Sequence, residues 1–230
     1  MDFQLNPELN LEQITKDFSA DHRVQINDLL PVEQAAHLSQ CLAEKITYKQ
    51  AFVVDGNFGE ASLEQLNDLK VEDRDKLLND VNQQAASGVG FWYERNVIQA
   101  NDTELTGDLF KWLNSDALLE TVANITGTDK CSGATAQSTR YKPGDFLTRN
   151  KSDATEEKRK LAFVMNLSPR WHADWGGMLQ FYQPDATPRD TWSPNFNSLA
   201  LFDVSHIHSV TYVAPFAQEP QLAIRGWFVG

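Results

Sequence analysis

Four side chains in the last third of the chain are of types that could hold a metal ion. His172 and Asp174 form a literal His-x-Asp, and His206 and His208 flank a single residue further along. Two imidazoles and one carboxylate are a ligand set for Fe(II) that leaves coordination positions open for chemistry. The sequence therefore offers a candidate metal site around His208, with His172, Asp174 and His206 as its candidate partners.

Both pairs also have ordinary structural explanations. His172 and Asp174 lie between Trp171 and the two glycines of a DWGG turn, which is typical of a hairpin rim rather than of a ligand pair. If residues 206–208 form a strand, both histidines share one face of it. Such a pair can bind Zn or Cu, and more often it is structural.

A dense series of short motifs surrounds these residues. They are YKPGDFLTRN at 141–150, FVMNLSPRW at 163–171, DWGGMLQFY at 174–182, FNSLALFDV at 196–204, HSVTYVAPFA at 208–217 and LAIRGWF at 222–228. Together these motifs resemble the 2-oxoglutarate- and Fe(II)-dependent dioxygenases of the prolyl-4-hydroxylase type, over roughly residues 24–228. The resemblance implies a double-stranded β-helix, Fe(II) and 2-oxoglutarate as cofactors, and oxidoreductase activity.

The positions that carry the chemistry of that family are mostly replaced here. The resemblance places the first metal His at Asn150, the metal carboxylate at Ser152, the second metal His at His208 and the co-substrate Arg at Gln221. Only His208 keeps the expected residue type. Iron affinity needs several convergent donors, and Gln221 cannot neutralise a carboxylate as the fork of an Arg does. We therefore expect Fe(II) and 2-oxoglutarate not to be bound.

Arg225 is a further departure near the same positions. Alternate residues from 221 to 227 face the same way on a strand, which places Arg225 inside the barrel about 13 Å from Gln221. The resemblance implies a small Thr or Ser there. Arg225 either fills the vacated metal space and binds an anion, or pairs with an internal carboxylate such as Asp145, because a buried Arg needs a partner. Tyr141 matches a family Tyr that lines the co-substrate pocket, so the predicted cofactor-binding set is Tyr141, Gln221 and Arg225.

The elements that must position these residues fall into two regions. Helical support is expected over residues 23–133, with strands at 22–30, 51–56 and 88–95, a helix from Pro31 to about Lys45, and helical spacing at 62–87 and 105–126. In residues 134–230 short strands alternate with turn clusters, which is typical of a jelly roll. The predicted fold is α+β, a double-stranded β-helix with N-terminal helices packed on one sheet. Residues 1–22 are expected to form an extended or loosely helical arm, followed by one oxygenase-like domain over 23–230. The Pro-rich segment 183–195 is expected to form a long loop, either a lid or a rim.

Composition narrows the range of partners. The net charge of −12 over 230 residues argues against nucleic acid, since binding to phosphates depends on Lys and Arg. No apolar run approaches the roughly 20 residues of a membrane span, and no signal peptide is visible, so a cytoplasmic protein is expected. Cys41 and Cys131 form neither a metal motif nor a disulfide framework. A protein partner or a small anionic ligand remains the expected partner.

Three functions follow from these residues. The first, favoured by the replacements at Asn150, Ser152 and Gln221, is a non-catalytic family member, a pseudoenzyme that keeps its pocket as a binding or interaction module. The second is an active protein or small-molecule hydroxylase with an unusual metal site around His208. The third is a metal-free enzyme, or a binder of an anionic ligand, that uses Arg225. Because a fold does not determine a function, the geometry of the site must decide between them.

Overall fold

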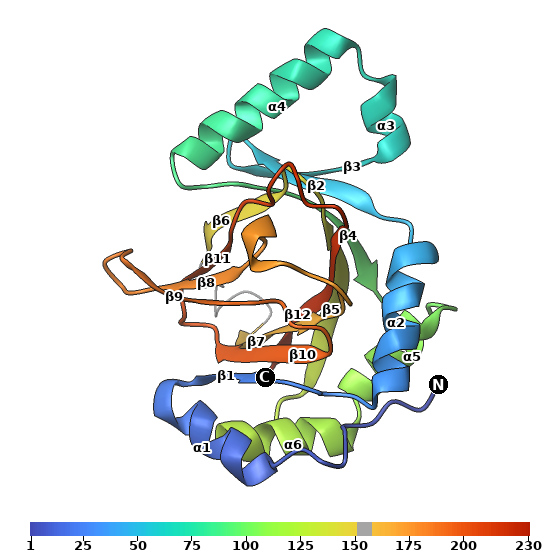
Figure 1. Cartoon of the computed structure of the whole chain (residues 1–230), viewed down its shortest axis with the longest axis vertical. Coiled ribbons are helices and arrows are strands. Elements are labelled where there is room, and N and C mark those ends of the chain that lie inside the picture. Colours follow the sequence, from blue (N-terminus) through green and yellow to red (C-terminus); the bar gives the residue numbers. More distant parts are fainter. Residues whose placement is uncertain (151–157) are drawn as a thin grey trace.

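An antiparallel sheet that curls into a nearly closed barrel forms the centre of the molecule (Figure 1). In this computed structural model, residues 1–150 and 158–230 are described. The strands are β1 Arg23–Ile26, β2 Lys49–Val54, β3 Asn57–Ser62, β4 Phe91–Ile98, β5 Gly133–Tyr141, β6 Phe146–Asn150, β7 Arg159–Asn166, β8 Leu179–Tyr182, β9 Pro188–Trp192, β10 Ser198–Asp203, β11 His208–Val210 and β12 Gln221–Val229. Their order in the sheet is β1-β10-β7-β12-β5-β4-β6-β11-β8-β9, and β2 joins β3 to β4. The predicted α+β double-stranded β-helix is confirmed.

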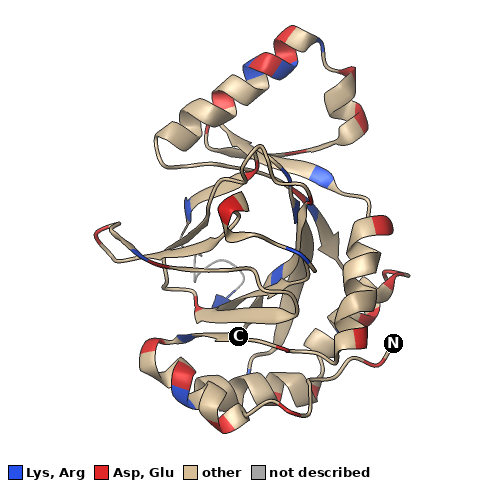
Figure 2. Cartoon of the chain, in the orientation of Figure 1, with Lys and Arg blue, Asp and Glu red and all other residues tan. Residues whose placement is uncertain are grey.

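Helices cover the outer side of this barrel. They are α1 Leu11–Asp21, α2 Val32–Glu44, α3 Leu63–Asp68, α4 Val71–Ala86, α5 Leu105–Leu113 and α6 Asp116–Thr126. Figure 1 shows α1 and α6 below β1 and β10, α2 and α5 beside β5 and β12, and α3 and α4 above the β2–β3 hairpin. Among the described residues, no helix is long and apolar enough to cross a membrane. Figure 2 shows acidic residues spread over several outer helices, α1 and α4 among them, rather than gathered in one place.

Strand alternation divides the apolar residues of the barrel between two cores. On β7, Leu161 and Phe163 belong to the large core beneath the helices, whereas Ala162 and Val164 belong to a second core inside the barrel. The same alternation occurs on β12, where Leu222, Ile224 and Phe228 belong to the large core and Ala223 belongs to the core inside the barrel. Successive side chains of a strand point to opposite faces, so Gln221 and Arg225 face the barrel interior, as the sequence predicts.

Two segments differ from the sequence expectation. Residues 1–22, expected as an extended or loosely helical arm, contain the regular helix α1, and they add Phe3 and Phe18 to the large core. Asn10 caps α1 by accepting a hydrogen bond from the backbone N–H of Gln13, which is a favoured N-cap arrangement. The Pro-rich segment 183–195, expected as a loop, contains β9, which forms a hairpin with β8.

Candidate functional site

A cavity of about 210 Å³ opens into the barrel between β4, β6, β11 and β12. Its polar lining residues include Gln137, Thr148, Arg149, Asn150, His208 and Arg225. The rest of the wall is largely apolar and aromatic, and includes Phe91, Leu147, Phe202 and Trp227. A concave, mostly apolar pocket with a few convergent polar groups is the usual form of a small-molecule site.

Asn150 and His208 stand side by side at this cavity. They are directly paired residues of the antiparallel strands β6 and β11, and side chains of directly opposed residues lie close together on one face. The register therefore brings together two of the positions that the sequence assigned to the metal. Ser152, the third of these positions, lies outside the described residues.

The imidazole of His208 is held in one tautomer. Its Nδ1 lies 3.1 Å from the carbonyl oxygen of His206, and since a carbonyl only accepts, Nδ1 carries the hydrogen. Burial lowers the pKa of His208 to about 4, and the neighbouring charge of Arg225 acts in the same direction. His208 is therefore neutral near pH 7, with the lone pair of Nε2 as its free acceptor.

Gln221 closes the barrel interior on the side of Arg225 that lies away from the cavity. Its Nε2 donates a 2.7 Å hydrogen bond to the carbonyl oxygen of Gly177. A Cβ at Gly177 would lie 2.7 Å from Gln221 Nε2, and the backbone φ there is +65°, so both contact and conformation favour glycine. The void beside Gln221 measures only about 10 Å³, which leaves no room for a ligand there.

Arg225 lies between the cavity and this closed end, and it lines both. Its side chain is buried, with the residue 9% exposed. Nη1 donates a 2.9 Å hydrogen bond to the hydroxyl of Tyr141, and the guanidinium stacks 4.5 Å from the centre of the Tyr141 ring. Nε has no hydrogen-bond partner within residues 1–150 and 158–230. The guanidinium is thus only partly satisfied by the protein.

The ion pair expected between Arg225 and Asp145 does not form. Asp145 is buried, and its carboxylate accepts a 2.8 Å hydrogen bond from the backbone N–H of Lys142. Burial raises the pKa of Asp145 to about 7. This hydrogen bond links residues three positions apart, so Asp145 stabilises the turn before β6. Arg225 has no carboxylate partner among the described residues.

Tyr141 connects Arg225 to an aromatic stack. Its fully buried ring lies parallel to that of Tyr93, with centres 4.9 Å apart. Burial raises the pKa of the Tyr141 phenol above its usual value, so this hydroxyl is un-ionised. The predicted group of Tyr141, Gln221 and Arg225 is therefore on one face of the barrel, but Gln221 is turned to Gly177 and contributes nothing to the cavity.

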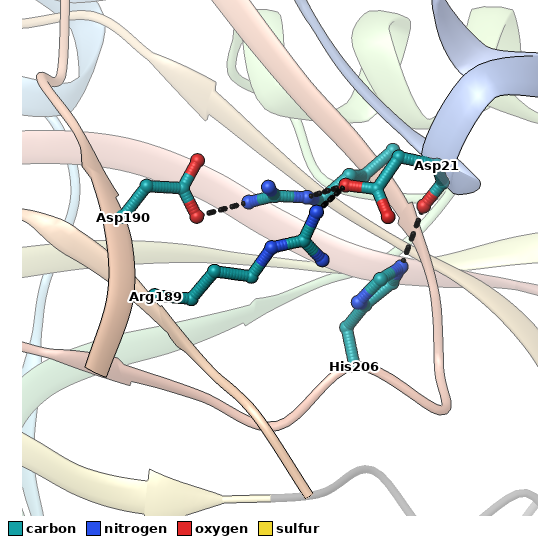
Figure 3. A network of polar contacts seen from close by, with 5 residues as sticks. Asp21, Arg189, Asp190 and His206 are labelled. Carbon is teal, nitrogen blue, oxygen red and sulfur yellow. Dashed lines mark hydrogen bonds and ion pairs between the residues drawn. The ribbon is translucent and has the colours of Figure 1, made fainter. Parts of the chain in front are cut away.

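His206 does not share a strand face with His208. It lies in the turn before β11, and its Nε2 is 3.0 Å from the carbonyl oxygen of Asp21 at the end of α1. Figure 3 shows His206 turned toward Asp21, whose carboxylate pairs with Arg189 and Arg23. This network fastens α1 to the barrel, so the contribution of His206 is structural.

His172 and Asp174 lie on the surface, away from His208. Both are exposed in and beside the short 3-10 helix Ala173–Trp175, and the ring of His172 packs 5.4 Å from that of Trp175. No group of three His, Cys, Asp or Glu side chains placed to hold a metal ion occurs within residues 1–150 and 158–230. The alternative set of His172, Asp174 and His206 therefore does not converge on His208.

Substituting His172 tests this placement. We expect His172→Ala to change the free energy of unfolding by no more than about 0.5 kcal/mol, as for most surface substitutions, and to leave the metal content unchanged. Thermal unfolding and metal analysis of the variant beside the unchanged protein measure both quantities. A loss of bound metal in His172→Ala would instead show that His172 is a metal ligand, in a site formed with Asp174 and His208.

Two lining residues went unnoticed in the sequence. Gln137 lies opposite Arg225 in the β5–β12 pair, and its Oε1 accepts a 3.0 Å hydrogen bond from Nη1 of Arg95. Arg149, on β6, is exposed at the cavity mouth and also lines an open groove against the end of α4. The inward alternation that identified Arg225 could have identified Gln137 once the β5–β12 register was known.

Comparison with known proteins relates this barrel to an oxygenase superfamily. A sequence profile of the 2OG-Fe(II) oxygenase superfamily matches residues 136–229. Prolyl 3-hydroxylase OGFOD1 of Xenopus laevis is 25% identical over 223 residues, 86% of this chain and 43% of that protein. The Mus musculus OGFOD1 is 36% identical over 81 residues, 32% of this chain and 15% of that protein. The chain thus spans less than half the length of these curated relatives.

Solved structures share the architecture over nearly the whole chain. A Trichoplax adhaerens prolyl hydroxylase, solved with a peptide fragment of the hypoxia-inducible-factor oxygen degradation domain, gives a TM-score of 0.64 at 16% identity, covering 95% of this chain and 88% of that one. A Pseudomonas putida prolyl-4-hydroxylase gives 0.58 at 14% identity, covering 95% and 98%. At these identities the likeness shows the double-stranded β-helix fold and leaves the activity to the site residues.

Proposed function

We propose that this chain, which belongs to the 2-oxoglutarate- and Fe(II)-dependent oxygenase superfamily and is prolyl-hydroxylase-like, is a non-catalytic member that keeps the barrel cavity as a ligand-binding site. One observation carries the proposal. A buried guanidinium, that of Arg225, occupies the interior beside His208, the one family ligand that this sequence retains.

The residues present do not fit Fe(II). Asn150 stands where an imidazole would be needed, beside His208, and the residue type at 152 brings no negative charge. A divalent cation next to Arg225 would be repelled, and at short range in the protein interior unit charges interact strongly. Affinity for Fe(II) comes from several convergent donors, preferably with anionic character, and this site supports only one such donor among the described residues.

The residues do not fit 2-oxoglutarate either. A dicarboxylate needs a cation for its distal carboxylate, and Gln221 offers none. That end of the barrel is also closed by the hydrogen bond from Gln221 to Gly177, with about 10 Å³ of free space. The residues present therefore support neither iron nor 2-oxoglutarate chemistry at this site.

Metal analysis tests the proposal directly. We expect purified protein, titrated with Fe(II) without oxygen, to retain far less than one iron per chain, because one retained imidazole cannot replace three ligands. We also expect no succinate release and no oxygen consumption with 2-oxoglutarate. Stoichiometric iron together with succinate release coupled to oxygen consumption would show that the chain is an active oxygenase.

A further inference from the structure

Within the part of the chain that the structure describes, Arg225 has no counter-charge, although it lies where a buried cation is costly. Removing a charged group from water is unfavourable unless partners compensate for it. Here the guanidinium has one hydrogen bond to Tyr141, a stacking contact with the same ring, and an unpartnered Nε. A buried and incompletely paired Arg that lines a cavity is the arrangement expected of an anion-binding group.

The cavity wall favours an anion with an apolar body. Its described lining residues include Arg149 and Arg225 but neither Asp nor Glu, although the whole chain carries a charge of −12. Arg225 is the buried cation of this described lining, and Arg149 is exposed. Beyond these groups the wall is formed by side chains such as Phe91, Leu147 and Trp227, which favour an apolar ligand surface.

The size of the cavity limits the ligand. About 210 Å³ is below the roughly 300–1,000 Å³ of pockets for drug-sized molecules. The barrel is closed beyond Arg225 by Gln221 and Gly177, so a chain with a second carboxylate cannot extend past the guanidinium. A ligand that fits is therefore short and carries its charge at one end.

We infer that the cavity binds a small organic monocarboxylate, with its carboxylate on Arg225 and its apolar body against Phe91, Leu147 and Trp227. The guanidinium fork can donate two parallel hydrogen bonds to a carboxylate, a geometry that a neutral side chain does not reproduce. Gln137 can add a donor, since its Oε1 is engaged by Arg95 and its amide nitrogen remains to be offered. The inference rests on the proposed function, because Fe(II) and its co-substrate would compete for the same space.

Phenylacetate is a suitable probe, and isothermal titration calorimetry measures its affinity. We expect phenylacetate to bind the unchanged full chain and Arg225→Met to weaken binding at least about tenfold, as for the loss of a hydrogen bond to a charged group. Arg74→Met is the matched control: Arg74 is exposed on α4, so the same change in net charge there leaves the affinity within about twofold. 2-Oxoglutarate is expected to bind no more tightly than acetate.

Phenylacetamide keeps the shape of the probe and removes its charge. We expect it to bind the unchanged protein at least about tenfold more weakly than phenylacetate, so the test stands even if Arg225→Met fails to fold. Absence of phenylacetate binding at millimolar concentration, equal affinities for acid and amide, or an undiminished affinity in folded Arg225→Met would each overturn the inference. Iron content, measured separately, tests whether the chain is non-catalytic. A protein that holds no iron and does not bind phenylacetate would therefore refute only the ligand inference.

Discussion

Iron binding should appear when the family residues are restored. We expect the variant that combines Asn150→His, Ser152→Asp, Gln221→Arg and Arg225→Thr to bind close to one Fe(II) per chain and to bind 2-oxoglutarate, and we expect the unchanged protein to bind neither. Inductively coupled plasma mass spectrometry gives the iron content, and anaerobic calorimetry gives the 2-oxoglutarate affinity. Both readouts are independent of turnover.

The expectation rests on strand pairings that already place the substituted positions inside the barrel. A His at position 150 would stand directly opposite His208, and an Arg at position 221 would point into the barrel from the paired position of Tyr141. The larger side chain at 221 needs space, and Arg225→Thr supplies it at the closed end that Arg225 now lines. Ligands held on packed strands are preorganised, which is what a metal site requires.

The variant with only the first three substitutions isolates the effect of Arg225. It should bind Fe(II) much more weakly than the quadruple variant, because a guanidinium beside the metal repels it and fills part of the space. Equal iron content in the triple and quadruple variants would show that Arg225 does not face the metal position. Absence of iron from a well-folded quadruple variant would mean that the pocket has been rebuilt.

Strand periodicity made the barrel interior predictable. The alternation of β12 gives Gln221 and Arg225 the same inward face as Ala223, and the same rule applied to β7 separates its two cores. Such assignments depend only on the period of the strand, which the sequence displays directly. The replacements at Asn150 and Gln221 could likewise be assigned, because Asn150 ends one recognisable motif and Gln221 directly precedes another.

Partner choice inside the barrel could not be predicted in the same way. Asp145 was expected to pair with Arg225, whereas the carboxylate accepts a hydrogen bond from the nearby backbone of Lys142. Arg225 instead contacts Tyr141, which lies 84 residues away in the sequence. Local turns compete with distant partners for the same side chain, and only the register of β5 against β12 shows which contact is within reach.

The polarity of residues 1–22 left open whether they are extended or helical, and it gave no sign that they pack against the barrel. Most of α1 is polar and exposed, and Phe18 is its one buried residue, so the apolar stripe expected of a packed helix is barely present. Tertiary contacts decide the outcome: α1 packs against β1 and α6, and Asp21 at its end pairs with Arg23 and Arg189 (Figure 3). The segment is therefore part of the folded domain, which makes its removal costly.

Phe18→Ala should destabilise the protein by about 3–5 kcal/mol, the usual cost of deleting a buried aromatic ring and leaving a cavity. The ring is 1% exposed and belongs to the core shared by the helices and the barrel. Phe58→Ala is the matched control, since Phe58 is 53% exposed on the β2–β3 hairpin and its loss should cost less than about 1 kcal/mol. Urea unfolding monitored by circular dichroism measures both changes. Equal, small effects would show that residues 1–22 are a dispensable arm, whereas a large difference means that the barrel and its cavity depend on α1 for their stability.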